Sequence, residues 1–138
     1  MKNFYTRALI TILCALFLSA TVQAQEPLQE VVQYIRGGNV TGMAKYLDKS
    51  VDININNNQA SYSSSQAEII LKDFFSKNVV KEFNVAQGGN TGTSSQYAIG
   101  DLQTSTGLFQ LYVVIKMNDN KFLIKQLRFE KIDKKPAQ

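Results

Sequence analysis

The clearest hydrophobic pattern in this chain runs from Leu108 to Ile132, where apolar and polar residues alternate along two runs. Successive side chains of a strand point to opposite faces, so the alternation predicts two long strands that share one apolar face. The residues at 118–120, Asn-Asp-Asn, tolerate positive φ and predict a tight turn between the runs. Because a lone hairpin is marginal in water, its apolar face needs a cover.

Two registers of this hairpin differ in the side chains that reach the core. A three-residue turn at 119–121 keeps one face apolar, and it pairs Met117 with Leu123, Val113 with Leu127, and Leu111 with Phe129. A two-residue turn shifts the pairing by one position and turns Gln126 and Arg128 toward the apolar side. The first register buries more apolar surface and is the one we predict. It groups four residues on the outer face as a candidate interaction surface: Tyr112, Gln126, Arg128 and Glu130.

The upstream segments have helical periodicity. A first helix begins at Pro27 and ends at Gly37, with apolar residues at i, i+3, i+4 and i+7. Asn39 is expected to cap a second, short helix. A capping box of Ser65 and Glu68 predicts the start of a third. The apolar stripe of this third helix is Ala67, Ile70, Leu71 and Phe74, widened by Ile69 and Phe75.

Shorter alternating runs predict the remaining strands. They are a short hairpin at 51–63, a strand at 79–87, a loop at 88–95 and a strand at 96–104. Sequential strands tend to pair, so we expect an α+β fold whose N-terminal helices pack on a strongly curved antiparallel sheet of about four main strands. A pocket is expected between the helices and the sheet, lined by Phe74, Tyr97, Val113, Ile115 and Leu127.

Residues 1–24 have the pattern of a secretory signal peptide. Lys2 and Arg7 precede an apolar run that ends in small residues at Ala24. Cys14 lies inside that run rather than after it, which argues against a lipid anchor. Cleavage leaves 114 of the 138 residues, 25–138, as a single domain without cysteine. We expect an exported protein, periplasmic or secreted, with no stable membrane anchor.

The composition excludes several kinds of chemistry. Two of the 15 basic residues belong to the leader, so 13 basic residues face 11 acidic ones, too small an excess to indicate nucleic-acid binding. The chain has no histidine, and its one cysteine lies in the leader, which excludes His-assisted nucleophiles and zinc sites of the usual type. No metal or other cofactor is expected. What remains is carboxylate and tyrosine chemistry, for which Asp101 with Tyr97 and Tyr112 are the candidates.

Several short motifs resemble a family of small exported bacterial proteins known as a domain of unknown function. They are Tyr62-Ser63, Gln66-Ala67-Glu68, the run Leu71 to Phe75, Tyr97 to Gly100, Gly107 with Phe109, and Gln126-Leu127-Arg128. The element order is similar to the nuclear-transport-factor-two-like cone of ketosteroid isomerase and scytalone dehydratase, a cystatin-like architecture. The resemblance implies a fold and no established reaction.

Three hypotheses follow from these patterns. The first is a non-enzymatic domain that binds an unidentified small ligand or protein partner through the cone pocket or the sheet face. The second is an isomerase- or dehydratase-like enzyme that uses Asp101 with Tyr97 or Tyr112. The third is a homodimeric interaction module that pairs through the outer face of the sheet.

Overall fold

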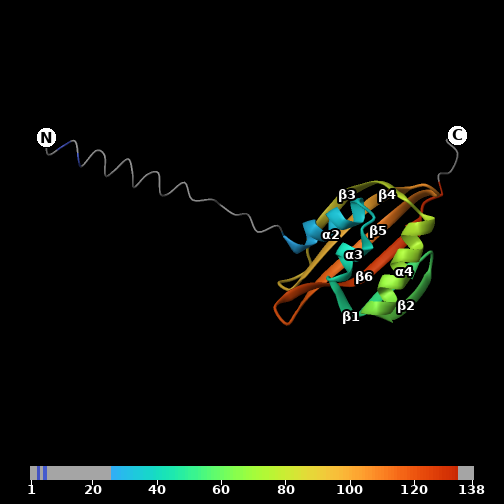
Figure 1. The fold of residues 1–138 in the computed structure, drawn as a ribbon, viewed down its shortest axis with the longest axis horizontal. Coiled ribbons are helices and arrows are strands. Elements are labelled where there is room, and N and C mark those ends of the chain that lie inside the picture. Colours follow the sequence, from blue (N-terminus) through green and yellow to red (C-terminus); the bar gives the residue numbers. More distant parts are fainter. Residues whose placement is uncertain (1–2, 4, 6–25, 134–138) are drawn as a thin grey trace.

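Three helices lie on one face of a single sheet (Figure 1). They are α2 (Pro27–Arg36), α3 (Val40–Ala44) and α4 (Ser64–Lys77). The computed structural model describes residues 3, 5 and 26–133, so the predicted signal peptide falls outside the described residues apart from Asn3 and Tyr5. In the described part of the chain, no helix is long and apolar enough to cross a membrane.

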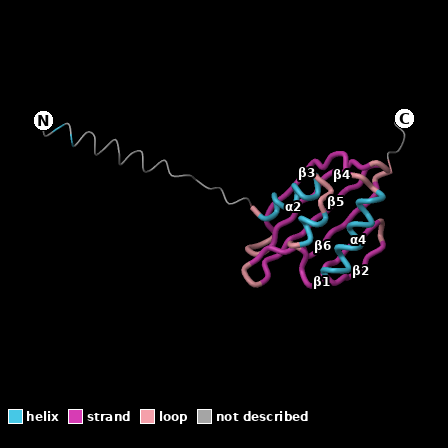
Figure 2. Tube along the Cα trace, viewed as in Figure 1, coloured by secondary structure: helices cyan, strands magenta, loops and turns pink. Residues whose placement is uncertain are grey.

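The sheet has six strands rather than about four, and it is not purely antiparallel. Figure 2 shows the helices and strands along the Cα trace. The strands are β1 (Leu47–Ile55), β2 (Asn58–Ser63), β3 (Val80–Asn90), β4 (Ser95–Thr104), β5 (Gly107–Asn118) and β6 (Lys121–Lys131). Their order is β2-β1-β6-β5-β4-β3, with β1 parallel to β6 and every other pair antiparallel. The predicted early hairpin is therefore part of the main sheet, because it docks on the C-terminal strand. The sheet stays open, with β2 and β3 at its edges.

The helix ends follow the capping residues with one correction. Pro27 occupies the first turn of α2, and the Asn39 side chain accepts a hydrogen bond from the Gly42 N–H at 2.9 Å. The capping box of α4 is formed by Ser63 and Gln66, not by Ser65 and Glu68. The two boxes overlap in the sequence, and the one that begins where β2 ends is used.

The long hairpin combines features of both registers. Asp119 and Asn120 have φ of 49° and 62° and form a two-residue turn, so Met117 pairs with Phe122 and the predicted three-residue turn is wrong. A bulge at Lys125 then absorbs one residue, because Ile115 pairs with Ile124 and Val114 with Gln126. Beyond the bulge the predicted partners return, Val113 with Leu127 and Leu111 with Phe129.

Aromatic side chains fill the space between α4 and the sheet. The Phe74 ring lies 4.3 Å from the Phe129 ring and 5.3 Å from the Phe109 and Phe75 rings, measured between centroids. All four side chains are buried. Ile69, which was expected to widen this stripe, is 67 % exposed instead. The interior beneath α4 is therefore a packed core.

Candidate functional site

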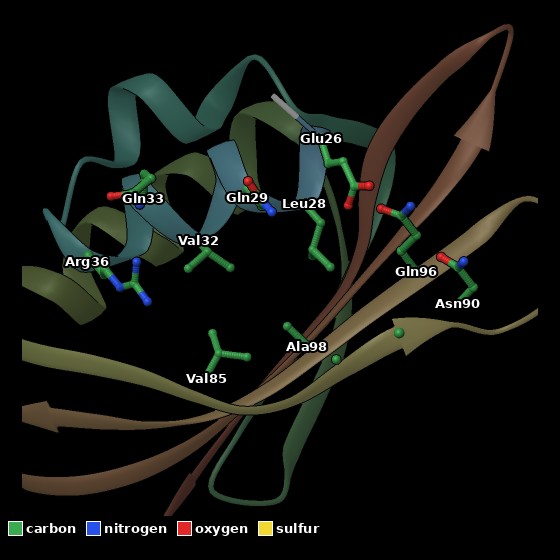
Figure 3. Close-up of a pocket in the computed structure, with 12 residues that line it drawn as sticks. Glu26, Leu28, Gln29, Val32, Gln33, Arg36, Val85, Asn90, Gln96 and Ala98 are labelled. Atoms are coloured by element: carbon green, nitrogen blue, oxygen red, sulfur yellow. The ribbon is translucent and has the colours of Figure 1, made fainter. Parts of the chain in front are cut away.

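A cavity lies beside α2, between that helix and the ends of β3 and β4 (Figure 3). We call it the α2 cleft, and its volume is about 610 Å³, within the range usual for small-molecule sites. Its lining residues come from the start and one side of α2 and from the inner faces of both strands: Glu26, Leu28, Gln29, Val32, Gln33, Arg36, Val85, Gly88, Gly89, Asn90, Gln96 and Ala98.

The middle of the α2 cleft is apolar. Val32 faces it from α2, while Val85 and Ala98 face it from β3 and β4 (Figure 3). Val85 is 39 % exposed although it points inward, because the cleft separates it from α2. Gly88, which pairs with Ala98, adds bare backbone to the floor of the cleft. An apolar group placed here would be removed from water on both sides.

One end of the α2 cleft is basic. Arg36 lies in the last turn of α2, and its Nε donates a hydrogen bond to the backbone oxygen of Phe83 at 3.0 Å. That bond orients the guanidinium plane, and Figure 3 shows the group directed into the cleft. Among the described residues, no carboxylate forms an ion pair with Arg36. Its terminal N–H groups are therefore available to an anion.

The other end of the α2 cleft carries acceptors. Gln96 points to the inner face of β4, where it pairs with Asn90 and Ile115, and its Oε1 is buried without a hydrogen-bond partner in the described part of the protein. Glu26 precedes α2, and its side chain makes no capping hydrogen bond. Figure 3 shows the two groups at the same end of the cleft. A buried acceptor without a partner costs about 1–3 kcal/mol, which a donor from a ligand would recover.

A second cavity of about 540 Å³ lies between α4 and the β1–β2 hairpin. Several of its polar side chains already pair with each other or with backbone: Lys77 bonds to Asp73 at 3.1 Å, and the Asn56 side chain accepts from the Lys131 N–H at 2.9 Å. Such a site offers a ligand fewer unpaired groups than the α2 cleft does.

The five predicted pocket residues do not line one cavity. Val113, Ile115 and Leu127 are at most 1 % exposed and belong to the core, and Phe74 sits in the aromatic cluster at the edge of the second cavity. Tyr97 points to the opposite face of the sheet, because its neighbours on β4, Gln96 and Ala98, point inward and successive strand residues alternate. Three of the five predicted residues therefore lie in the packed core of the described chain.

The enzymatic trio is only partly assembled. The rings of Tyr97 and Tyr112 lie 6.2 Å apart on the outer face of the sheet, and Tyr97 accepts a hydrogen bond from Gln87 at 3.0 Å. Asp101 is exposed and lines neither of the two large cavities. The structure therefore does not gather the three residues around either of these cavities.

The predicted interaction face does come together. Tyr112 pairs with Arg128, Gln126 pairs with Val114, and Arg128 forms an ion pair with Glu130 at 3.2 Å. Tyr112, Arg128 and Glu130 line a shallow groove of about 210 Å³ with Ile99 and Gln110. The bulge at Lys125 is the reason that Arg128 stays on this outer face.

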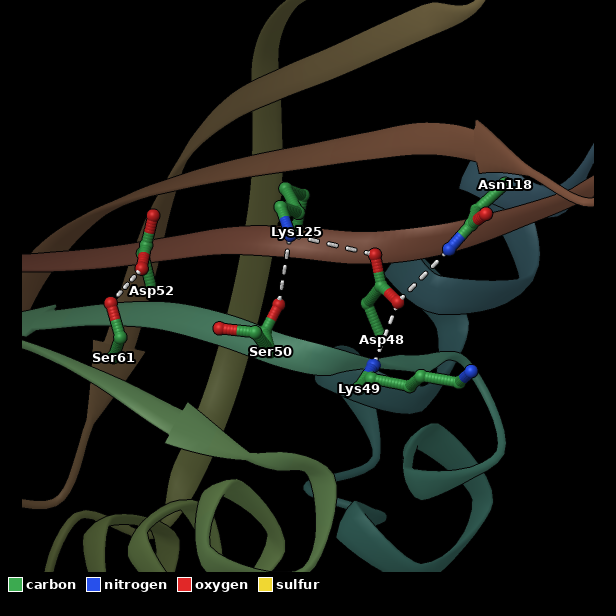
Figure 4. A network of polar contacts seen from close by, with 7 residues as sticks. All are labelled: Asp48, Lys49, Ser50, Asp52, Ser61, Asn118 and Lys125. Carbon is green, nitrogen blue, oxygen red and sulfur yellow. Dashed lines mark hydrogen bonds and ion pairs between the residues drawn. The ribbon is translucent and has the colours of Figure 1, made fainter.

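That bulge has its own polar support (Figure 4). Lys125 reaches across to β1, where its Nζ bonds to the Ser50 oxygen at 3.3 Å and lies 3.7 Å from Asp48 Oδ2. Asp48 is only 6 % exposed and also accepts from the Lys49 N–H at 2.7 Å and from Asn118 at 3.4 Å. Its carboxylate is satisfied within the fold, so we assign it a structural role.

Lys45 sits against two tyrosine rings near α3. Its Nζ lies 5.2 Å from the Tyr34 ring centroid and 5.3 Å from that of Tyr46. A side-chain hydrogen bond with Tyr34 raises the pKa of Lys45, and it outweighs desolvation, which lowers that pKa; weaker electrostatic attraction to Tyr34 and Glu30 also raises it. Lys45 is therefore held in its charged form, outside the α2 cleft.

Sequence reasoning missed Arg36 and Gln96. The available signal for Gln96 was its inward position on β4, in series with Ala98, Gly100 and Leu102, where a polar side chain is out of place. Arg36 follows Val32 by one helical turn, so it lies on the same side of α2.

Comparisons with known proteins bear on the fold. A DUF4783 family protein from Bacteroides uniformis is 31 % identical, with a TM-score of 0.75 over 79 % of this chain and 100 % of that one. Another from Bacteroides fragilis is 35 % identical, with a TM-score of 0.70 over 75 % and 96 %. An NTF2-like protein of unknown function from Cytophaga hutchinsonii is similar in fold alone, at 11 % identity and a TM-score of 0.57 over 83 % and 95 %. A search of curated proteins returned no match.

The profile of the family described as Domain of unknown function (DUF4783) matches residues 28–130. This range runs from the second residue of α2 to the second-to-last residue of β6. The chain therefore belongs to this family and has an NTF2-like fold.

Proposed function

We propose that this domain is a non-enzymatic binding module that acts after export and holds a small amphipathic ligand in the α2 cleft. One observation carries the proposal: the buried Gln96 Oε1 has no hydrogen-bond partner in the described protein and lines a cavity of about 610 Å³. Proteins seldom leave buried acceptors unpaired, and an acceptor that faces a cavity is open to a donor from a molecule bound there.

The residues of the α2 cleft favour binding over catalysis. The cleft lining holds amides, glycines, aliphatic side chains, one arginine and one exposed carboxylate, Glu26. None of these twelve residues is a serine, threonine, cysteine or lysine that would act as a nucleophile.

Export is proposed from the N-terminal pattern, and cell fractionation of the tagged protein tests it.

The test of binding is a fragment library screened by NMR against the purified protein, with shift changes mapped on the backbone. We expect ligands to perturb α2 together with the inner faces of β3 and β4. Val85 lines the cleft and is partly exposed, so Val85→Phe would place an aromatic ring in the cleft. This variant should abolish the shift changes caused by ligands. Asn84→Phe is the matched control, because the adjacent side chain points to the other face of the same strand. Ligands that bind both variants equally would refute the site.

A second candidate function is homodimerisation through the outer face. The groove that joins Tyr112, Arg128 and Glu130 on an exposed sheet surface favours it. Light scattering should then detect a dimer that Tyr112→Ala weakens. A monomer at millimolar concentration would exclude this role.

A further inference from the structure

We infer that the α2 cleft selects short peptides with free termini, with the peptide carboxylate on Arg36 and its ammonium beside Glu26 and Gln96. This inference rests on the proposed function, whose ligand class it specifies. It follows from the opposite polarity of the two ends of the cleft, from the distance between them, and from the apolar stretch that separates them.

The length of α2 sets the length of the ligand. Glu26 is the N-cap of this helix and Arg36 is its last residue, 10 positions later, so the two ends of the cleft are separated by about 15 Å at 1.5 Å per residue. An extended peptide advances about 3.3 Å per residue, and four or five residues therefore span the distance. A single amino acid is too short to reach both ends.

The basic end suits a carboxylate better than a neutral group. The bond from Arg36 Nε to the Phe83 oxygen fixes the guanidinium plane and leaves the two terminal nitrogens free. Those nitrogens donate in parallel, which matches the two oxygens of a carboxylate. No ion pair within the described residues competes for Arg36.

The acceptor end distinguishes a peptide from a fatty acid or another simple anion. Gln96 Oε1 and the Glu26 carboxylate both accept hydrogen bonds, and neither is satisfied by a hydrocarbon tail. An ammonium group carries three donors and a positive charge, so it satisfies both acceptors together. A ligand with only a carboxylate would leave Gln96 Oε1 buried and unpaired.

The middle of the cleft favours aliphatic side chains and a close backbone. Val32, Val85 and Ala98 supply apolar contact, while Gly88 and Gly89 expose strand backbone without side chains in the way. Gln29 and Gln33 line the helix side with amides that are able to bond to peptide groups.

The experiment is calorimetric titration with a pooled library of tetrapeptides and pentapeptides that have valine, leucine or alanine at the inner positions. The best binder is then remade with an amidated C-terminus and with an acetylated N-terminus. We expect each modification to weaken binding to the natural protein at least tenfold. In the Arg36→Gln variant, amidation of the peptide should not weaken binding further, because the group that binds the carboxylate is already lost. In the Glu26→Gln variant, acetylation should likewise not weaken binding further. Each variant and its peptide modification thus form a double-mutant cycle. Lys116→Gln is the control. It removes an exposed positive charge on β5 that does not line the cleft, so this variant should bind the peptides like the natural protein.

The outcomes separate this inference from the proposed function. Peptide binding that is indifferent to both modifications would overturn the assignment of the two ends. No peptide binding, combined with other fragments that perturb the cleft, would overturn the peptide inference and leave the binding module standing. No perturbation of the cleft by either library would refute both.

Discussion

Replacing Gln96 by methionine should make the protein more stable. The substitution keeps the length of the side chain and removes an acceptor that is buried without a partner. Leaving such an atom unpaired costs about 1–3 kcal/mol, so the free energy of unfolding should rise by about that amount. For a domain of this size we expect a thermal midpoint at least about 4 °C higher.

The assay is urea denaturation followed by circular dichroism, for the natural protein, Gln96→Met and Gln103→Met. Gln103 lies on the same strand and is exposed, so its replacement should change the unfolding free energy by less than about 0.5 kcal/mol. The slope with urea should be equal in all three proteins, which shows that the difference is one of stability and not of compactness.

An unchanged or lowered stability of Gln96→Met would refute the reasoning, because the Gln96 amide would then be satisfied within the protein. The same variant should also respond less to ligand. A ligand that binds the native state raises stability by RT ln(1 + [L]/Kd), so a cleft ligand should stabilise the natural protein more than Gln96→Met.

Three further predictions concern other parts of the fold. Gly100→Ala should lower the unfolding free energy by about 1–3 kcal/mol or more, because the added Cβ would lie 2.5 Å from the backbone oxygen of Asn84; equal urea midpoints would contradict this. Tyr34→Phe should lower the pKa of Lys45 in an NMR titration. Because that pKa is raised in the fold, its contribution to stability is complete below about pH 10.4 and is lost as pH rises through the folded value; an unshifted titration would exclude the hydrogen bond. Ser63→Ala should cost about 1 kcal/mol by removing the cap of α4, and an equal loss in Ser65→Ala would argue for the other capping box.

The local elements could be predicted because their signals are local. Alternation predicted β4, β5 and β6, and the i, i+3, i+4 spacing with Pro27 and Asn39 predicted α2 and α3. The place of β1 could not be predicted in this way. Its parallel pairing with β6 joins residues more than 70 positions apart, and it is decided by whether Ile53 and Leu127 share the core.

The hairpin register shows why one rule was insufficient. The turn residues favour a two-residue turn, whereas the apolar pattern favours the pairing of a three-residue turn. The bulge at Lys125 satisfies both demands. A bulge leaves no mark in apolar alternation when its extra residue is a lysine, since a polar residue fits either register.

The α2 cleft was beyond prediction because it depends on side-chain size across two layers. Where α4 faces the sheet, Phe74 meets Phe109 and Phe129, and the rings close the interior. Where α2 faces the sheet, Val32 meets Ala98, and these small side chains leave a gap. Both helices carry an apolar stripe at helical spacing, and that spacing alone does not say where a gap is left beneath a helix. The facing side chains differ in volume: aromatic rings fill the space between α4 and β5–β6, and small side chains line the α2 cleft. The α2 cleft therefore lies under the first helix of the described chain rather than at the centre of the cone.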